Sequence, residues 1–186
     1  LQASLVRLAK NGGKGAAVIS GLYVADNMNF THAIQIDADG QHDLAAVTDF
    51  LDQAHHNPQA LVCGYPIYDQ TVPLSRLWGR KLTNFWVHVN TRSKALRDAM
   101  CGFRVYPLAQ TLPVLPSVKT RRMDFDPDIV VRLIWAGVTV INRPVRVTYP
   151  KDGISHFRGF SDNMRISRLH AGHFCTMLLR RMGLAK

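Results

Sequence analysis

The 186-residue sequence contains only three cysteines, which is too few and too scattered for a cysteine-based site. Cys63, Cys101 and Cys175 are far apart, and no Cys-x-x-Cys pair occurs. Their odd number and wide spacing exclude a small disulfide scaffold and a cysteine-rich zinc module. Cys101 is expected to be a packed core residue, and the reducing cytoplasm is the expected location.

Long apolar runs, internal repeats and low-complexity segments are also lacking. No run reaches the roughly 18 apolar residues that span a bilayer, and the first residues lack the apolar stretch of a secretory signal. Apolar residues nevertheless make up 47% of the sequence. That share is enough to bury a core within one domain, which excludes a disordered or fibrous chain.

Acidic residues are scarce, 13 against 23 lysines and arginines, and the imbalance is uneven along the chain. Residues 1–75 carry seven acidic and three basic side chains, whereas residues 151–186 carry two acidic and seven basic ones. The acidic first part predicts a cation site, and the basic remainder predicts an anionic ligand or surface. Nucleic acid, phospholipid and a nucleotide diphosphate would each fit the predicted anionic ligand or surface.

Short β-type runs alternate with longer helical ones, which predicts an α/β fold with a largely parallel sheet. Strands are expected at Val6–Leu8, Ala33–Asp37, Ala60–Gly64, Phe103–Tyr106 and Val138–Thr148. Helices are expected at Ala16–Asn27, Leu44–His56, Leu74–Arg92, Pro127–Ala136 and Ser161–Met182, with Gly137 ending the fourth. The stretches 65–73 and 149–160 predict loops. Because the chain opens with a short apolar run and a helix, without the leading strand and first turn that usually begin a doubly wound sheet, the sheet is expected to lack its first strand or strands.

The most informative segment follows an apolar strand and has the sequence Asp37-Ala38-Asp39-Gly40-Gln41-His42. Two carboxylates beyond a strand end can bind one hard divalent cation, with Gln41 or His42 as a further ligand. Open α/β sheets bind ligands at this end of their strands. The alternative is an Asp-Gly turn in which Asp43 caps the next helix.

Four motifs in order carry a resemblance to a known family. They are Asn11-Gly12-Gly13-Lys14-Gly15-Ala16-Ala17, the turn from Asp37 to His42, Asp98-Ala99-Met100-Cys101-Gly102-Phe103-Arg104-Val105-Tyr106, and Gly153-Ile154-Ser155-His156. The chain resembles the nucleotide-sugar-dependent glycosyltransferases of GT-A fold. More narrowly, it is similar to the large inverting family 2 that includes the polyprenyl- and dolichyl-phosphate sugar transferases. The first strand of that family and its early aspartate have no counterpart here.

The resemblance implies roles for particular residues. Asp37, Asp39 and Gln41 would hold Mg²⁺ or Mn²⁺. The residues that would contact the donor or its nucleotide are Lys14, Asp37, Asp98, Arg104, Ser155, His156 and Arg158. Asp126 matches the base of family members that glycosylate hydroxyl groups, and Asp128 matches the acid of the polyprenyl-phosphate enzymes.

Each motif also has a plain structural explanation. The segment from Asn11 to Gly15 lacks the Walker spacing and can be a glycine-rich turn before a helix. Asp98 can form a surface ion pair with Arg97 or Arg104. Asp126 can cap a helix that has Pro127 at its first position. The loop of residues 150–158 can be a solvated basic loop.

The expected partners are a nucleotide-sugar donor, a lipid-linked or glycan acceptor, and an anionic membrane surface. Residues 1–160 would form the transferase domain. Residues 161–186 would add an amphipathic basic helix that rests on the inner face of the membrane or closes the sheet. His170 and His173 are expected to have surface or packing roles. Two other functions stay open: a noncatalytic remnant of the fold, and a basic nucleic-acid-binding module, for which the sequence shows no recognition motif.

Overall fold

The computed structural model describes residues 5–68, 72, 74–148 and 159–184. Helices alternate with strands along the chain, which confirms the predicted α/β class. The elements are α1 (Lys14–Asn27), β1 (His32–Gln35), η1 (Leu44–Ala46), α2 (Val47–His56), β2 (Leu61–Tyr68), α3 (Leu74–Thr91), β3 (Arg104–Pro107), α4 (Leu108–Thr111), η2 (Leu115–Ser117), α5 (Phe125–Trp135), β4 (Val140–Val147) and α6 (Gly159–Arg181).

The four strands form one mixed sheet in the order β1-β3-β2-β4. β3 is antiparallel to both of its neighbours, so that Val105 lies opposite Ile34 of β1 and Val62 of β2. β2 and β4 are parallel, with Leu61 opposite Val140. Three strands therefore share one direction, but only one pair is parallel, which corrects the prediction of a mostly parallel sheet. Side-chain alternation is the same for a strand of either direction, so the sequence pattern could not show the reversal of β3.

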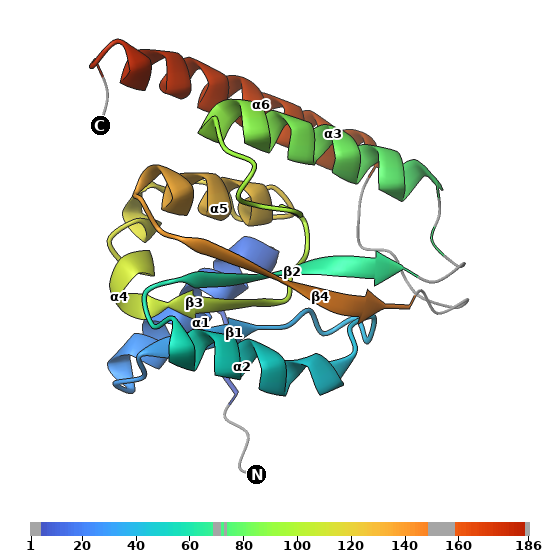
Figure 1. Cartoon of the computed structure of the whole chain (residues 1–186), viewed down its shortest axis with the longest axis vertical. Coiled ribbons are helices and arrows are strands. Elements are labelled where there is room, and N and C mark those ends of the chain that lie inside the picture. Colours follow the sequence, from blue (N-terminus) through green and yellow to red (C-terminus); the bar gives the residue numbers. More distant parts are fainter. Residues whose placement is uncertain (1–4, 69–71, 73, 149–158, 185–186) are drawn as a thin grey trace.

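Alternation along the strands gives the sheet two apolar faces. Cys63 and Tyr106 belong to the core shared with α1, α3 and α5, and Val62 and Val105 belong to the core shared with α2. Figure 1 shows α2 on one side of the sheet, and α5 on the other with α3 and α6 beyond it. The sheet is therefore a middle layer whose strand ends remain available for a site.

Several predicted elements have different bounds. Residues 6–8 form no strand, and β2 continues to Tyr68, into the segment that was expected to be a loop. α5 begins at Phe125 rather than at Pro127, so Asp126 lies in the first turn and is not the cap. Gly137 ends α5 with a φ of +84°, as predicted. The short elements α4 and η2 were not predicted.

β1 has an open edge in the described part of the chain. The amide of Leu108 donates to the carbonyl oxygen of Thr31 at 2.9 Å. Because hydrogen bonding alternates along an antiparallel pair, His32 and Ile34 direct their own N–H and C=O groups away from β3. This open edge is consistent with a partial GT-A sheet.

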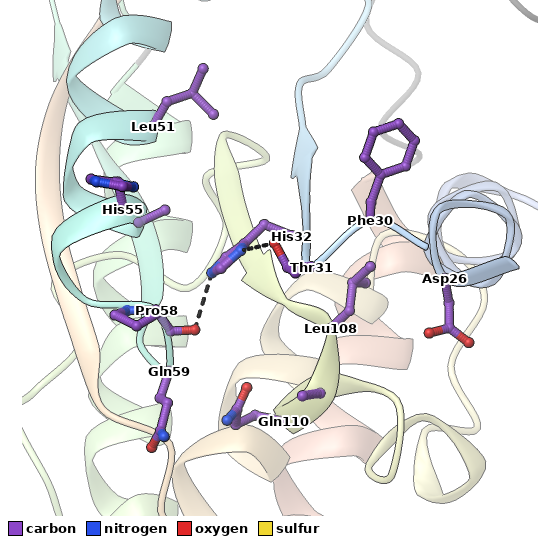
Figure 2. A pocket seen from close by; sticks show the side chains of 12 residues that line it. Asp26, Phe30, Thr31, His32, Leu51, His55, Pro58, Gln59, Leu108 and Gln110 are labelled. Carbon is purple, nitrogen blue, oxygen red and sulfur yellow. Dashed lines mark hydrogen bonds between the residues drawn. The ribbon is translucent and has the colours of Figure 1, made fainter. Parts of the chain in front are cut away.

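A hollow of about 700 Å³ lies at the amino end of β1. Figure 2 shows Leu51 and His55 of α2 on one side of it and Phe30 on the other. His32 lies between them, with one ring nitrogen 3.1 Å from the carbonyl oxygen of Pro58. The acidic turn follows the opposite end of β1, so this hollow is separate from the predicted cation site.

α6 packs against α3 and α5 largely through polar side chains. Asp162, His170 and His173 are each 5% exposed or less. His170 stacks on Trp86 with 6.5 Å between ring centres, and Asn90 donates to the carbonyl oxygen of His170 at 3.3 Å. The two histidines therefore have packing roles, as expected.

The buried imidazole of His170 makes stability depend on pH. Burial, with a smaller contribution from His173, lowers the pKa of His170 from 6.5 to about 4. Between these values the unfolded chain binds a proton that the folded protein excludes. The free energy of unfolding should therefore fall as the pH drops through this window, by up to about 1.4 kcal/mol per pH unit. His170→Phe, which keeps an aromatic ring on Trp86, should flatten this dependence in urea unfolding between pH 7 and 5.

His55→Phe is the matched control, because His55 is an exposed histidine on α2. Its stability should keep the pH dependence of the unchanged protein. Equal slopes for His170→Phe and the unchanged protein would show that another group is responsible.

Candidate active site

The site lies at the edge of the sheet where three strands finish and one begins. β1, β2 and β4 run toward this edge, and β3 starts there with Arg104. Asp37 follows the end of β1 by two residues. The amide of Thr148, just after β4, donates to the carbonyl oxygen of Gln41 at 3.0 Å. The acidic turn therefore lies beside the end of β4, where ligands of open α/β sheets bind.

Lys14 joins two acids that are far apart in the sequence. Its Nζ donates to Asp37 at 2.8 Å and to Asp126 at 2.5 Å. The Lys14 side chain is 18% exposed, Asp37 is 24% exposed and Asp126 is 2% exposed. Burial alone would lower the pKa of Lys14, but the two carboxylates outweigh it and the pKa is raised. The ammonium is therefore charged and holds the two carboxylates together.

Asp126 is supported from beneath by strand residues. Gln35 donates to its carboxylate at 3.2 Å and accepts from the hydroxyl of Tyr106 at 2.9 Å. Arg104 is fully buried and donates to the backbone carbonyl of Asp126 at 3.0 Å. Burial alone would raise the pKa of Asp126, but the positive charges of Lys14 and Arg104 outweigh burial. The pKa is therefore lowered, and the carboxylate stays ionised. Arg104, which the resemblance gave as a donor contact, thus lies behind Asp126 and is fully buried.

The glycines around Lys14 are needed for close packing. A Cβ on Gly13 would lie 2.6 Å from the carbonyl oxygen of Arg121, and one on Gly15 would lie 2.5 Å from the Cβ of Phe125. Gly13 also has a φ of +90°, which favours glycine. These contacts bring the start of α1 against the start of α5, so Lys14 can reach Asp126.

Asp37 is packed against Gly102. A Cβ added to Gly102 would lie 2.2 Å from an Asp37 carboxylate oxygen. Asp39 is exposed, and one of its oxygens accepts from the amide of Gln41 at 3.1 Å. His42 has a buried Nδ1 with no hydrogen-bond partner within the described ranges. Burial lowers the pKa of His42, while Asp37 and Asp39 act to raise it.

These residues fit a hard cation that is held partly by its ligand. In the described ranges, no three acidic, histidine or cysteine side chains cluster to form a complete metal cage. Mg²⁺ commonly uses one or two protein carboxylates and takes its other ligands from substrate phosphates and water. Asp37 and Asp39 would supply two such carboxylates, and Gly102 packs directly against the first of them.

Asp98 forms an ion pair, but with a different partner from those predicted. Arg80 of α3 donates to it at 2.7 Å, and the amide of Met100 donates to the same oxygen at 2.9 Å. Asp98 is 5% exposed, so this is a largely buried pair rather than a surface pair with Arg97 or Arg104. It fixes the segment before Gly102 against α3.

Asp128 points away from Lys14. Its carboxylate accepts from Arg132 at 2.5 Å, from Thr120 at 2.8 Å and lies 2.9 Å from a ring nitrogen of His173. Burial would raise the pKa of Asp128, but these partners lower it. Asp128 therefore joins α5 to α6, while Asp126, two residues earlier, joins the acidic turn.

Ser155, His156 and Arg158 lie outside the described residues. Conversely, sequence reasoning missed Gln35 and Tyr106, which hold Asp126 from the sheet. The available signal was a glutamine two residues before Asp37, on a strand next to the apolar residues Ala33 and Ile34.

The chain is distantly related to a glycosyltransferase. No family model matches the chain. Dolichyl-phosphate beta-glucosyltransferase of Dictyostelium discoideum is 26% identical to it over 133 residues. The match covers 67% of this chain and 40% of that protein, so the chain spans well under half of its relative's length. The resemblance predicted from the motifs is confirmed at this level, as distant homology to a glycosyltransferase.

Removing one partner of the buried pair of Lys14 and Asp126 should destabilise the protein strongly. Lys14→Met leaves the Asp126 carboxylate without its ammonium partner, and breaking a buried pair in this way costs about 3 kcal/mol. We expect a loss of that size in the free energy of unfolding, measured with urea. The double variant Lys14→Met/Asp126→Asn should recover part of the loss, because the unpaired charge is gone.

Lys10→Met is the matched control, because Lys10 is exposed on the same segment. It should change stability by less than about 0.5 kcal/mol. A Lys14→Met loss no larger than that of the control would show that the bridge is energetically neutral.

Proposed function

We propose that the protein is an inverting glycosyltransferase that moves a sugar from a nucleotide-diphosphate donor to an acceptor. The observation that carries the proposal is the Lys14 bridge between Asp37 and Asp126 at the ligand-binding edge of an α/β sheet. The distant relationship to a dolichyl-phosphate beta-glucosyltransferase supports the same class of reaction. In-line transfer needs a donor site and one group that serves the acceptor, and the two acids supply one side chain for each.

Asp37 and Asp39, with Gln41, would hold Mg²⁺ or Mn²⁺ beside the donor. The cation would act as a Lewis acid that stabilises the diphosphate leaving group. Lys14 provides a fixed ammonium next to Asp37 and can contact the same phosphates. Ser155, His156 and Arg158 remain predicted phosphate contacts. Cationic and hydrogen-bonding side chains that face the charge developing on the leaving group are usually the largest source of rate enhancement in such a step.

Asp126 is the acid that we assign to the acceptor side, in preference to Asp128. Asp126 shares Lys14 with the donor-side acid, whereas Thr120, Arg132 and His173 surround Asp128. A hydroxyl acceptor would require Asp126 as a general base. We propose a lipid phosphate, in line with the relative's name. Such an acceptor is already an anion, and Asp126 would then keep Lys14 in position.

Donor binding should depend on a divalent cation at Asp39. Asp39→Ala should abolish Mn²⁺-dependent nucleotide-sugar binding and leave the fold intact, because Asp39 is exposed and its carboxylate accepts from the amide of Gln41 in its own turn. Titration calorimetry with UDP-, GDP- and dTDP-sugars, in Mn²⁺ and in EDTA, measures this and identifies the nucleotide.

Asp43→Asn is the matched control. Asp43 lies in the same segment but caps η1 through the amide of Ala45, and asparagine is as good a cap. Its nucleotide-sugar binding should equal that of the unchanged protein. Equal binding in EDTA and in Mn²⁺ would contradict the assignment of the cation to Asp39.

We also propose that α6 brings the protein to an anionic membrane surface. Met164, Phe174 and Leu178 are each about 40% exposed, although they were also candidates for closing the sheet. Arg168 and Arg181 are exposed on the same helix. Among the described residues, no helix is long and apolar enough to span a bilayer. The proposed attachment of α6 is through apolar contacts and about 1 kcal/mol per basic residue near the surface.

Vesicle co-sedimentation tests this attachment. The protein should pellet with vesicles that contain phosphatidylserine and stay in solution with neutral vesicles, and salt should release it. Leu178→Gln should weaken pelleting, whereas Leu51→Gln should not, because Leu51 lies on α2 and is 48% exposed against 39% for Leu178. Equal pelleting with both kinds of vesicle would contradict the proposal.

A further inference from the structure

β1 is an edge strand in the described part of the chain, and its outer side has no neighbouring strand there. The sheet order β1-β3-β2-β4 pairs β1 with β3 alone. The N–H and C=O groups of His32 and Ile34 point away from β3, because hydrogen bonding alternates along an antiparallel pair. A row of outward donors and acceptors is a template for another extended segment. The edge therefore suits a polypeptide in the strand conformation.

Exposed apolar side chains surround this edge. The hollow at the amino end of β1 is lined by Leu51 of α2 and by Phe30, and Figure 2 shows them on opposite sides of His32. Phe30 is 56% exposed, Leu51 is 48% exposed and Ile34 of the strand itself is 36% exposed. Apolar side chains gathered beside an open strand edge indicate a surface that binds another polypeptide.

The segment of residues 5–8 has the composition of a strand but does not form one. Its sequence is Leu5-Val6-Arg7-Leu8, which explains why the sequence pattern predicts a strand there. The structure leaves this segment outside the four-stranded sheet. Leu5 is 83% exposed and Val6 is 50% exposed. The chain therefore carries both an open strand edge and an exposed segment that could cover one.

The charges of the segment and the edge are complementary. Residues 15–68, which include β1 and α2, contain six aspartates and no lysine, arginine or glutamate. Residues 5–14 contain three basic side chains and no acid. Lys14 is held in the candidate site, but Arg7 and Lys10 are exposed. Opposite charges of this kind steer two surfaces together and disfavour pairing between two copies of the acidic edge.

We infer that residues 5–8 of one copy of this chain pair with β1 of a second copy, which returns the same contact. Reciprocal exchange of one segment closes the assembly as a symmetric dimer. A second copy is the occupant because the segment lies off the sheet in its own chain. Residues 9–13, which include Gly12 and Gly13, connect the segment to α1 and provide the hinge.

Alternation along the added strand sends its side chains to both faces of the sheet. Val6 and Leu8 would lie on one face and cover Ile34 and Leu51. Arg7 would lie on the opposite face, on the side of α1. Each dimer contains this contact twice, so one substitution removes two contacts.

Sedimentation equilibrium over a range of protein concentrations tests the inference. The unchanged protein should be a dimer that dissociates on dilution and more readily in high salt, because the contact is partly electrostatic. Val6→Asp adds an acid to the exposed segment and should weaken the dimer tenfold or more. Ile34→Lys should do the same from the other side of the contact, because a lysine on an edge strand opposes strand pairing.

Two exposed apolar residues elsewhere provide matched controls. Leu184→Asp makes the corresponding change near the other end of the described chain, where Leu184 is 71% exposed. Ile67→Lys places a lysine on β2, where Ile67 is 48% exposed and lies away from the open edge. Both controls should dimerise like the unchanged protein. Thermal unfolding of all four variants shows whether each remains folded.

Cross-linking between two chains identifies the contact directly. In a Cys175→Ser background the remaining natural cysteines, Cys63 and Cys101, are buried. A chain with Val6→Cys is mixed with a size-tagged chain with Ile34→Cys and treated with a short bismaleimide. We expect a covalent product that contains one chain of each size, and little of it when Ile67→Cys replaces Ile34→Cys.

A protein that is monomeric at every concentration would overturn the inference, and so would a dimer that neither Val6→Asp nor Ile34→Lys weakens. Loss of the dimer in Ile34→Lys but not in Val6→Asp would show that two β1 edges pair with each other, which also contradicts the exchange of residues 5–8. Absence of the mixed cross-linked product would exclude the proposed contact. None of these outcomes depends on the proposed transferase function.

Discussion

The bridge from Lys14 to Asp37 and Asp126 is the contact on which the candidate site depends. It connects the start of α1, the turn after β1 and the start of α5, which are far apart in the sequence. Three charges in a space that excludes most water are stable only as a set, because either acid alone would be costly to bury beside the other. The glycines before and after Lys14 make this geometry possible. They let the start of α1 pack directly against the start of α5, so that the Lys14 side chain can reach Asp126.

The reversed strand β3 provides the floor of the site. Because it runs against β1 and β2, its first residue, Arg104, emerges at the edge where the other strands end. Arg104 and Tyr106 then lie on one face of β3, beneath Asp126, while Val105 faces the opposite core. A strand in the parallel direction would have placed its last residue at this edge instead. The direction of β3 therefore decides which side chains support the acid.

The sequence predicted the parts of the site that follow local rules. The strand before Asp37 and the helix cap formed by Asp43 depend only on neighbouring residues, and the structure contains both. Assigning different roles to Asp126 and Asp128 required knowing where α5 begins, and the prediction placed that start two residues late. Side chains two positions apart on a helix point about 200° apart, so only one of these acids can face Lys14. Gln35 could not be assigned at all, because its partner is 91 residues away.

α6 buries polar side chains and leaves several apolar ones exposed. It buries Asp162, His170 and His173 while Phe174 and Leu178 remain exposed. The buried polar groups specify how the helix sits on α3 and α5, since each must meet a partner such as Asp128 or Asn90. Covering one of the large exposed side chains completely would be favourable by about 1.5–3 kcal/mol. A helix that packs by polar contacts and exposes its apolar ones is suited to a surface or ligand that is itself apolar, and basic residues on the same helix select one that is also anionic.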